Sequence, residues 1–301
     1  MAKILGFFNL LFVTIIILPL FALIAYYFLL NNFIRDYEES YNTLGYIADD
    51  IISDIKTLIK NNLDKEITIR RNSTLALISV YDVLNDSKLS SSRLSNDIAN
   101  YTNKFFSKYN QFYGLSNSSL IIPSVNDNPE IFFTNGQRQR TYVSGTNIFF
   151  DFFGNNNATR INISINYNNS APYPSKTCRF NNVLISCNGG NFGTGFFNVT
   201  LNYTDNSGNS IFNFFINPTI TNNFTITYLS TPQKTVTLQI GKIATIDRSL
   251  RFSINRTAFA TINATFINNE QNYIMAYIPG NLYLKQFTVE KNISIIVLEE
   301  G

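Results

Sequence analysis

Residues 4–30 read ILGFFNLLFVTIIILPLFALIAYYFLL, and none of them is charged. As a helix rising 1.5 Å per residue, this run would be about 40 Å long, whereas the hydrocarbon core of a bilayer is roughly 30 Å thick. Tyr26, Tyr27 and Phe28 lie near its end, and aromatic residues are enriched at membrane interfaces. The residues that follow are rich in Asn, Ser, Thr and Tyr. The sequence therefore predicts a membrane anchor at residues 1–30.

A cleaved signal peptide is the alternative explanation of this run. The apolar region of a signal peptide usually spans about 7–15 residues and ends at a small-x-small site. The run here is longer, and near Ala22 and Ala25 the required small residue is replaced by Leu23. We therefore expect an uncleaved, single-pass signal-anchor. The flanking Lys3 and Arg35 are too evenly matched for the positive-inside rule to give its orientation.

Composition narrows the classes of function. The 301-residue chain has 23 Lys and Arg against 20 Asp and Glu, a net charge of +3, which is too balanced to indicate a nucleic-acid partner. It contains no His, which is the commonest general base and the commonest metal ligand. A Ser-His-Asp or Cys-His site is therefore impossible. We expect a protein that is not an enzyme, with no catalytic residues, no cofactor and no metal site.

The two cysteines, Cys178 and Cys187, flank a predicted turn. Asn181 and Asn182 lie between β-prone residues, and a four-residue loop at 181–184 would place the two cysteines opposite one another within disulfide reach. Two free, buried thiols are the alternative. A disulfide would indicate an oxidising compartment and hence an extracytoplasmic C-terminal region.

Thirteen Asn-x-Ser/Thr sequences follow the predicted anchor, and they predict N-glycosylation of an external glycoprotein. Their asparagines are Asn72, Asn85, Asn100, Asn117, Asn157, Asn162, Asn168, Asn198, Asn202, Asn223, Asn255, Asn263 and Asn292. A second explanation is purely structural. Residues two apart share one face of a strand, so an exposed face rich in Asn and Thr produces the same spacing.

Residues 31–64 are predicted to form an amphipathic helical stalk. Its apolar stripe repeats in steps of three and four residues and comprises Ile34, Tyr37, Tyr41, Leu44, Ala48, Ile51, Ile55 and Leu58. Nothing between Leu30 and Asn32 forces a break, so anchor and stalk are expected to form one helix. The stripe either packs on the protein's own domain or forms a coiled-coil or filament contact with further copies or other surface proteins.

The remaining chain divides by periodicity. Residues 65–110 are predicted to be a helical region of two helices, separated by a polar turn at 85–92, and residues 111–139 to be a β linker or strands. From about Ser116 the period is two. Strands are expected at 161–167, 195–205, 224–229, 235–240, 259–267, 273–278 and 293–298. Short strands separated by Asn, Gly and Pro turns favour an all-β sandwich, with residues 221–301 as a C-terminal β-rich domain.

Residues 193–210 read GTGFFNVTLNYTDNSGNS. This segment resembles the closing hairpin of extracellular immunoglobulin-like modules of the polycystic-kidney-repeat and bacterial Ig-like kind. In those modules a G-x-Y-x-V-T-V-x-x-x-D strand precedes an x-S-G-N turn and a last strand. Phe197 stands at the usual Tyr position, and residues 211–216 would be the last strand. The resemblance implies an Ig-like β-sandwich at 140–220 and says nothing about a ligand.

The N-terminal third is similar to type IV pilins and archaeal pilin-like proteins, which have a short basic leader, an apolar helix that continues amphipathically, and a β head. Gly6–Phe7 after Lys3 resembles a prepilin cleavage junction, although Leu11 stands where a Glu is usual.

The expected fold is an N-terminal transmembrane helix that continues into a helical stalk and is followed by an all-β, Ig-like ectodomain. The expected function is that of a single-pass, membrane-anchored cell-surface protein. It would be structural or adhesive and pilin-like, with the lipid bilayer as a partner. The alternative is a ligand- or partner-binding ectodomain of a sensory or secretion assembly.

Overall fold

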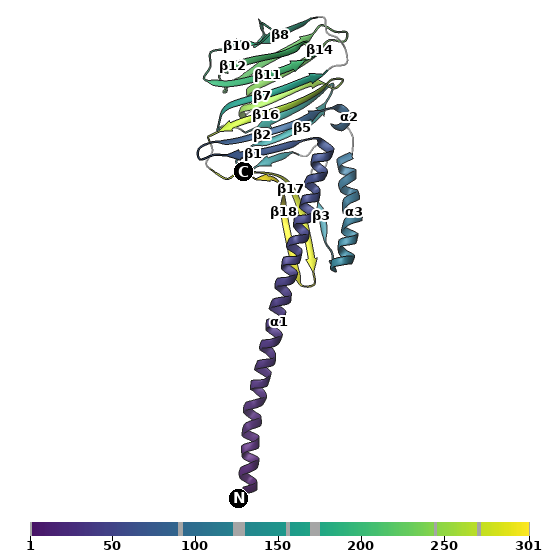
Figure 1. Ribbon diagram of the computed structural model, residues 1–301, viewed down its shortest axis with the longest axis vertical. Coiled ribbons are helices and arrows are strands. Elements are labelled where there is room, and N and C mark those ends of the chain that lie inside the picture. Colours follow the sequence, from purple (N-terminus) through teal and green to yellow (C-terminus); the bar gives the residue numbers. More distant parts are fainter. Residues whose placement is uncertain are drawn as a thin grey trace.

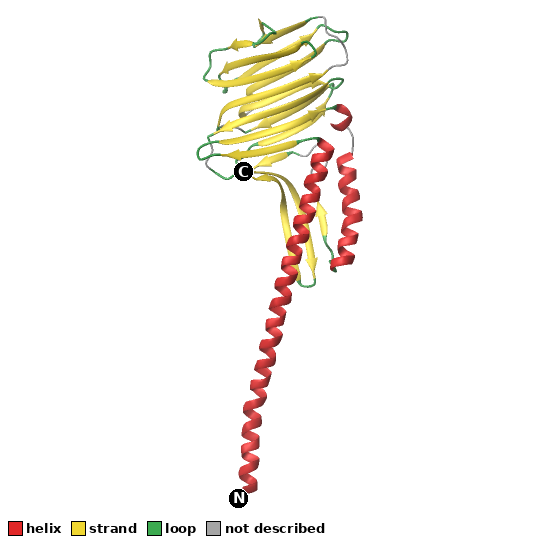
Figure 2. Ribbon diagram, in the orientation of Figure 1, coloured by secondary structure: helices red, strands yellow, loops and turns green. Residues whose placement is uncertain are grey.

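The computed structural model describes residues 2–89, 93–122, 130–154, 157–168, 175–243, 246–269 and 272–300. Helix α1 (Ala2–Leu63) runs without interruption through the predicted anchor and stalk and contains Pro19. Its N-terminal part extends away from the rest of the molecule, and its C-terminal part lies along a β-rich head (Figures 1 and 2). The expected long apolar helix followed by a β-rich domain is therefore confirmed.

The head consists of two β-sheets. Within the described residues, the seven-stranded sheet has the order β1 (Glu66–Arg71), β2 (Ala76–Leu84), β16 (Phe259–Asn268), β7 (Ala158–Asn168), β11 (Phe197–Asp205), β12 (Gly208–Ile216) and β10 (Gly190–Phe192). The path through the other sheet is β18 (Val289–Glu300), β17 (Met275–Gln286), β4 (Ile131–Phe133), β5 (Arg138–Ser144), β6 (Asn147–Phe153), β15 (Ile246–Asn255), β14 (Lys234–Ile243), β13 (Thr221–Tyr228), β8 (Lys176–Phe180) and β9 (Val183–Ile185). Strand β3 (Ser119–Ile121) pairs with β17.

Alternating apolar residues build the core between the sheets. Along β11, Phe197, Val199 and Leu201 are buried while the intervening residues are half-buried on the outer face. The rings of Phe152 on β6 and Phe266 on β16 stack across the interior with their centroids 3.7 Å apart. A period of two places one set of side chains on each face of a strand, which is why this pattern predicted the strands correctly.

The C-terminal part of α1 packs against β17, β18 and α3 (Arg93–Tyr113). Leu44, Ala48, Ile51 and Ile55 have no exposed surface. This part of the apolar stripe therefore belongs to the protein's own core and is closed to a coiled-coil or filament contact. The beginning of the stripe is different, because the side chains of 34, 37 and 41 are 47%, 46% and 47% exposed.

The predicted helical region at 65–110 is wrong in its first half. Residues 66–84 form β1 and β2, and β2 lies between β1 and β16. A short apolar run can be a buried strand or a buried helix, and pairing with β16 decides the outcome here. The second half is helical, as α2 (Asp86–Leu89) and α3. Part of the predicted turn, residues 90–92, lies outside the described residues.

Strands from the segments predicted as separate β units alternate within both sheets. β7 pairs with β11 and β16, and β15 pairs with β6. β3 and β4, from the predicted 111–139 segment, pair with β17. The predicted boundary at residue 220 therefore does not divide the head into two separate sheets. Strands from residues 140–220 pair directly with strands from residues 221–301.

Candidate functional site

The protruding half of α1 is the most exceptional surface of the molecule. Every side chain from Thr14 to Glu39 is exposed, including Phe21, Leu23 and Leu29. Among the described residues, Thr14–Asn62 contains a stretch long and apolar enough to cross a membrane. Contiguous apolar surface of this extent is unusual on a soluble monomer and marks a binding or membrane surface. The side chains of residues 2–13, including Gly6 and Phe7 of the pilin-like junction, are outside the described set.

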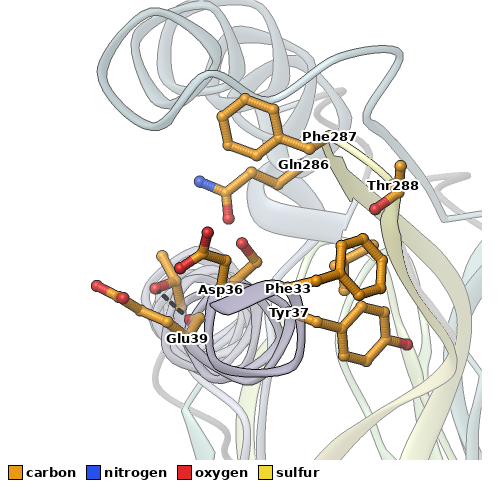
Figure 3. Close-up of a pocket in the computed structure, with 10 residues that line it drawn as sticks. Phe33, Asp36, Tyr37, Glu39, Gln286, Phe287 and Thr288 are labelled. Atoms are coloured by element: carbon orange, nitrogen blue, oxygen red, sulfur yellow. Dashed lines mark hydrogen bonds between the residues drawn. The ribbon is translucent and has the colours of Figure 1, made fainter. Parts of the chain in front are cut away.

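A pocket of about 470 Å³ lies where α1 leaves the head, between the helix and the turn that joins β17 to β18. Figure 3 shows the Gln286 amide and the Asp36 carboxylate facing one another, with the rings of Phe33 and Tyr37 on the side of Thr288. The lining thus combines aromatic rings with hydroxyl, amide and carboxylate groups. Such a combination can contact a surface that has both apolar and polar groups.

The end of α3 lies at the same level as this pocket, beside the β17–β18 turn (Figure 1). Gln286 donates from Nε2 to the Tyr113 carbonyl oxygen over 2.9 Å, and the Ser116 N–H donates to the Lys285 carbonyl oxygen over 2.9 Å. Phe112 is 81% exposed and Phe287 75%. We call Phe33, Tyr37, Phe112, Tyr113 and Phe287 the basal rim. Sequence reasoning missed this group, because its members come from three distant segments.

The disulfide Cys178–Cys187 is present, with the two Cα atoms 5.3 Å apart. The predicted four-residue loop is wrong, because Asn181 and Asn182 alone form the turn, with φ of 47° and 68°. Asn tolerates this left-handed conformation, which a two-residue hairpin requires. Cys178 consequently pairs with Ile185, and the disulfide links β8 to Cys187 in the segment that follows β9.

None of the thirteen candidate glycosylation asparagines is buried. The exposed ones are Asn72, Asn100, Asn117, Asn157, Asn168, Asn263 and Asn292, and the half-buried ones are Asn85, Asn162, Asn198, Asn202, Asn223 and Asn255. The rest of the Asn168 sequence, residues 169–170, lies outside the described residues. Most of these asparagines lie on the outer faces of strands. Their spacing therefore agrees with the structural explanation, in which residues two apart share one face of a strand.

Asp205, at the end of β11, is the centre of a buried polar network. Its Oδ2 accepts hydrogen bonds from Lys176 Nζ over 2.8 Å and from the Tyr228 hydroxyl over 2.6 Å, while Ser207 donates to Oδ1. Burial alone would raise the pKa of this carboxyl, but the bonds from Lys176, Ser207 and Tyr228 outweigh burial and hold the pKa below its ordinary value. Burial, together with Tyr203 and Asp205, raises the pKa of Tyr228. The network joins β8, β13 and the β11–β12 turn, so its role is structural.

A second charged group lies on the outer face of β5, β6 and β15. Arg251 makes two hydrogen bonds, of 2.7 and 2.9 Å, to the buried Asp151 carboxylate, and Arg140 approaches the same carboxylate at 3.4 Å. The Arg140 guanidinium lies 4.6 Å from the centre of the Tyr142 ring. Bidentate Arg–carboxylate pairs with ring contacts are stable and pre-organised. Sequence analysis did not find this group, since its members pair only through the sheet.

A third group lies inside the sandwich. Lys65 Nζ is 3.1 Å from Asp82 Oδ2 and donates to Gln139 Oε1 over 3.0 Å. Both charged side chains are buried, and a buried ion pair is stable only when further hydrogen bonds satisfy its members. The group therefore links β2 of one sheet to β5 of the other across the interior, an internal role.

Among the described residues, no group of three or more His, Cys, Asp or Glu is placed to hold a metal ion. Comparison with protein-family models, curated proteins and solved structures finds no match.

Proposed function

We propose that this chain is a single-pass, membrane-anchored surface protein with a structural or adhesive role. The observation that carries the proposal is the unbroken α1, whose side chains are all exposed from Thr14 to Glu39. Burying a large apolar side chain contributes about 1.5–3 kcal/mol, so a helix with this many exposed in water would partition strongly into a bilayer. The β-rich head would then stand at the membrane surface.

An extracytoplasmic position of the head is supported by two features. The Cys178–Cys187 disulfide is the kind of bond that persists in oxidising compartments. The exposed asparagines of the Asn-x-Ser/Thr sequences are accessible to glycosylation machinery where the cell has it. Both features lie in the head, so they favour the same side of the membrane.

Membranes from the native host test the anchor. The full-length chain should remain in the pellet after an alkaline carbonate wash, because an inserted helix resists conditions that strip peripheral proteins. A variant with Ile17→Asp, Phe21→Asp and Ile24→Asp should move to the soluble fraction, since each charge costs about 2.5–3.5 kcal/mol at the membrane centre. A wild-type chain that is released by the wash would refute the anchor.

Protease added to intact cells tests the orientation. An external head should be degraded without lysis, whereas a head degraded only after lysis would refute the extracytoplasmic position. A known internal protein serves as the control for cell integrity.

A ligand- or partner-binding ectodomain is the second candidate, and the outer-face group around Arg140, Tyr142 and Arg251 favours it. The Arg140 side chain is 42% exposed beside a ring, an arrangement that can bind an anionic or planar partner. Arg140→Ala with the head intact would abolish such binding, while the anchor test would give the same result for both candidates.

A further inference from the structure

The height of the basal rim above the apolar run is fixed by α1. The helix is continuous, so each residue adds 1.5 Å along its axis. Phe33 therefore lies about 5 Å beyond Leu30, the last residue of the apolar run, and Tyr37 about 10 Å beyond it. The polar layer on each side of a bilayer is roughly 5–8 Å thick. With Leu30 at the hydrocarbon boundary, the rim begins inside the headgroup layer.

The backbone at the basal rim holds aromatic rings exposed to solvent, as at Phe112 and Phe287. Phe287 occupies the first central position of the β17–β18 turn with a φ of 53°, where a two-residue hairpin ordinarily carries Gly. A bulky residue in this region is strained, and strain of this kind is concentrated at functional positions. Phe112 and Tyr113 end α3 next to this turn, held there by the Gln286 bond to Tyr113. Three separate elements thus present rings at the end of the head where α1 leaves it (Figure 1).

The charges at this level are mixed. Lys108 lines a surface hollow with Tyr109, Phe112 and Tyr113. On α1, Arg35 lies 3.8 Å from Asp36, and Lys285 pairs with Glu290 beside the turn. Glu38 and Glu39 add negative charge. A surface of rings with both signs of charge fits a zwitterionic headgroup layer, in which aromatic side chains are favoured and Lys side chains extend to phosphate.

We infer that the basal rim docks onto the headgroup and glycerol layer of the same bilayer that holds α1, and so fixes the tilt of the head. The inference rests on the proposed membrane anchor. The position of the rim along α1 selects the occupant. Phe33, its first ring, lies about 5 Å beyond the apolar run and therefore within the headgroup layer. Phe287 lines the same pocket as Phe33, and Tyr113 is bonded to Gln286, so a modest tilt of the head brings these rings to the lipid surface.

The absence of Trp from the chain allows a direct test with single-Trp variants of the full-length protein. Phe287→Trp and Phe112→Trp report on the rim, Phe21→Trp reports on the anchor, and Phe196→Trp is the matched control. Phe196 is as exposed as Phe287, at 75%, but it directly precedes β11, a strand in the half of the head that lies away from the β17–β18 turn (Figure 1). Each variant is reconstituted into phosphatidylcholine vesicles whose lipids carry bromine both near the glycerol end and near the middle of the acyl chains, so that the anchor and the rim can each meet a quencher.

We expect bromolipid to quench Trp at positions 21, 112 and 287 and to leave Trp at 196 unaffected, whereas aqueous iodide should quench position 196 at least several-fold more than the rim. Quenching at 21 without quenching at 112 and 287 would overturn rim docking and leave the anchor standing. Absence of quenching at 21 would overturn both. A rim shielded from iodide but unquenched by bromolipid would show that another protein copy covers it, which also overturns docking.

A paired variant tests cooperation between the rings. In Phe112→Trp, the additional change Phe287→Gly should reduce bromolipid quenching, since one ring of the rim is lost. The matched change Phe196→Gly should leave it unchanged. Equal quenching in all three proteins would overturn the assignment of Phe287 to the docking surface.

Discussion

Asp205 illustrates how a buried carboxylate makes stability depend on pH. Its pKa is held below the ordinary value in the folded head, so the stabilisation is complete above the unfolded pKa, near 4, and is lost as pH falls through the folded pKa. Asp205→Asn should lower the unfolding free energy by about 2 kcal/mol at pH 7, because Lys176 keeps its charge and loses its partner. Denaturant unfolding at pH 7 and below pH 4 measures this, and the gap between the two proteins should shrink in acid. A constant gap would contradict the role of the carboxylate.

At Phe287 we expect a substitution to stabilise the protein, in contrast to the substitution at Asp205. Phe287→Gly should raise the unfolding free energy by about 1 kcal/mol, since Gly adopts a positive φ without the cost that a side chain incurs there. Phe196→Gly is the control at equal exposure and should be neutral or slightly destabilising, because its φ is not in the left-handed region. Thermal unfolding in detergent compares the two. A destabilised Phe287→Gly would mean that the ring packs on the head, which would also weaken the membrane inference.

At the scale of elements, the β8–β9 hairpin shows a local constraint with a limited energetic effect. The disulfide joins residues only nine positions apart, so it removes little conformational entropy from the unfolded chain. Double substitution, Cys178→Ser with Cys187→Ser, should cost on the order of 2–3 kcal/mol at most and lower the melting temperature without preventing folding. A double variant that fails to fold would show that the bond supports more than its hairpin.

The elements also show what the sequence could and could not predict. α1 and the strands of the later chain were predictable because their periodicity is carried by each segment alone, as in residues 161–167 and 224–228. β1 and β2 were not, because the identity of residues 75–84 depends on pairing with β16, which lies more than 170 residues away. The basal rim was missed for the same reason: nothing local to Phe112 indicates that Phe287 lies nearby.

At the scale of the whole molecule, the apolar stripe of α1 is divided between two tasks. Ile51 and Ile55 are fully buried in the head, so Asp at either position should unfold it and would report nothing about assembly. The exposed beginning of the stripe, Ile34 and Tyr41, is the part that remains available to another copy. A pilin-like subunit would use this surface, whereas a solitary surface protein would not.

The last prediction therefore concerns Ile34→Asp with Tyr41→Asp. If the chain is a filament subunit, the mature protein begins at Phe7 and this double variant abolishes assembly while the head keeps its melting temperature, since neither side chain lies in the core. Intact mass of protein from the native host gives the mature terminus, and cross-linking of membranes gives the assembly state.

Ile51→Asp is the contrasting control, expected to lose the fold itself. A terminus at Met1 or Ala2, with no cross-linked species larger than the single chain, would refute the filament subunit. The same result would leave a solitary membrane-anchored head as the arrangement that accounts for an α1 that is apolar up to Leu30 and exposed up to Glu39.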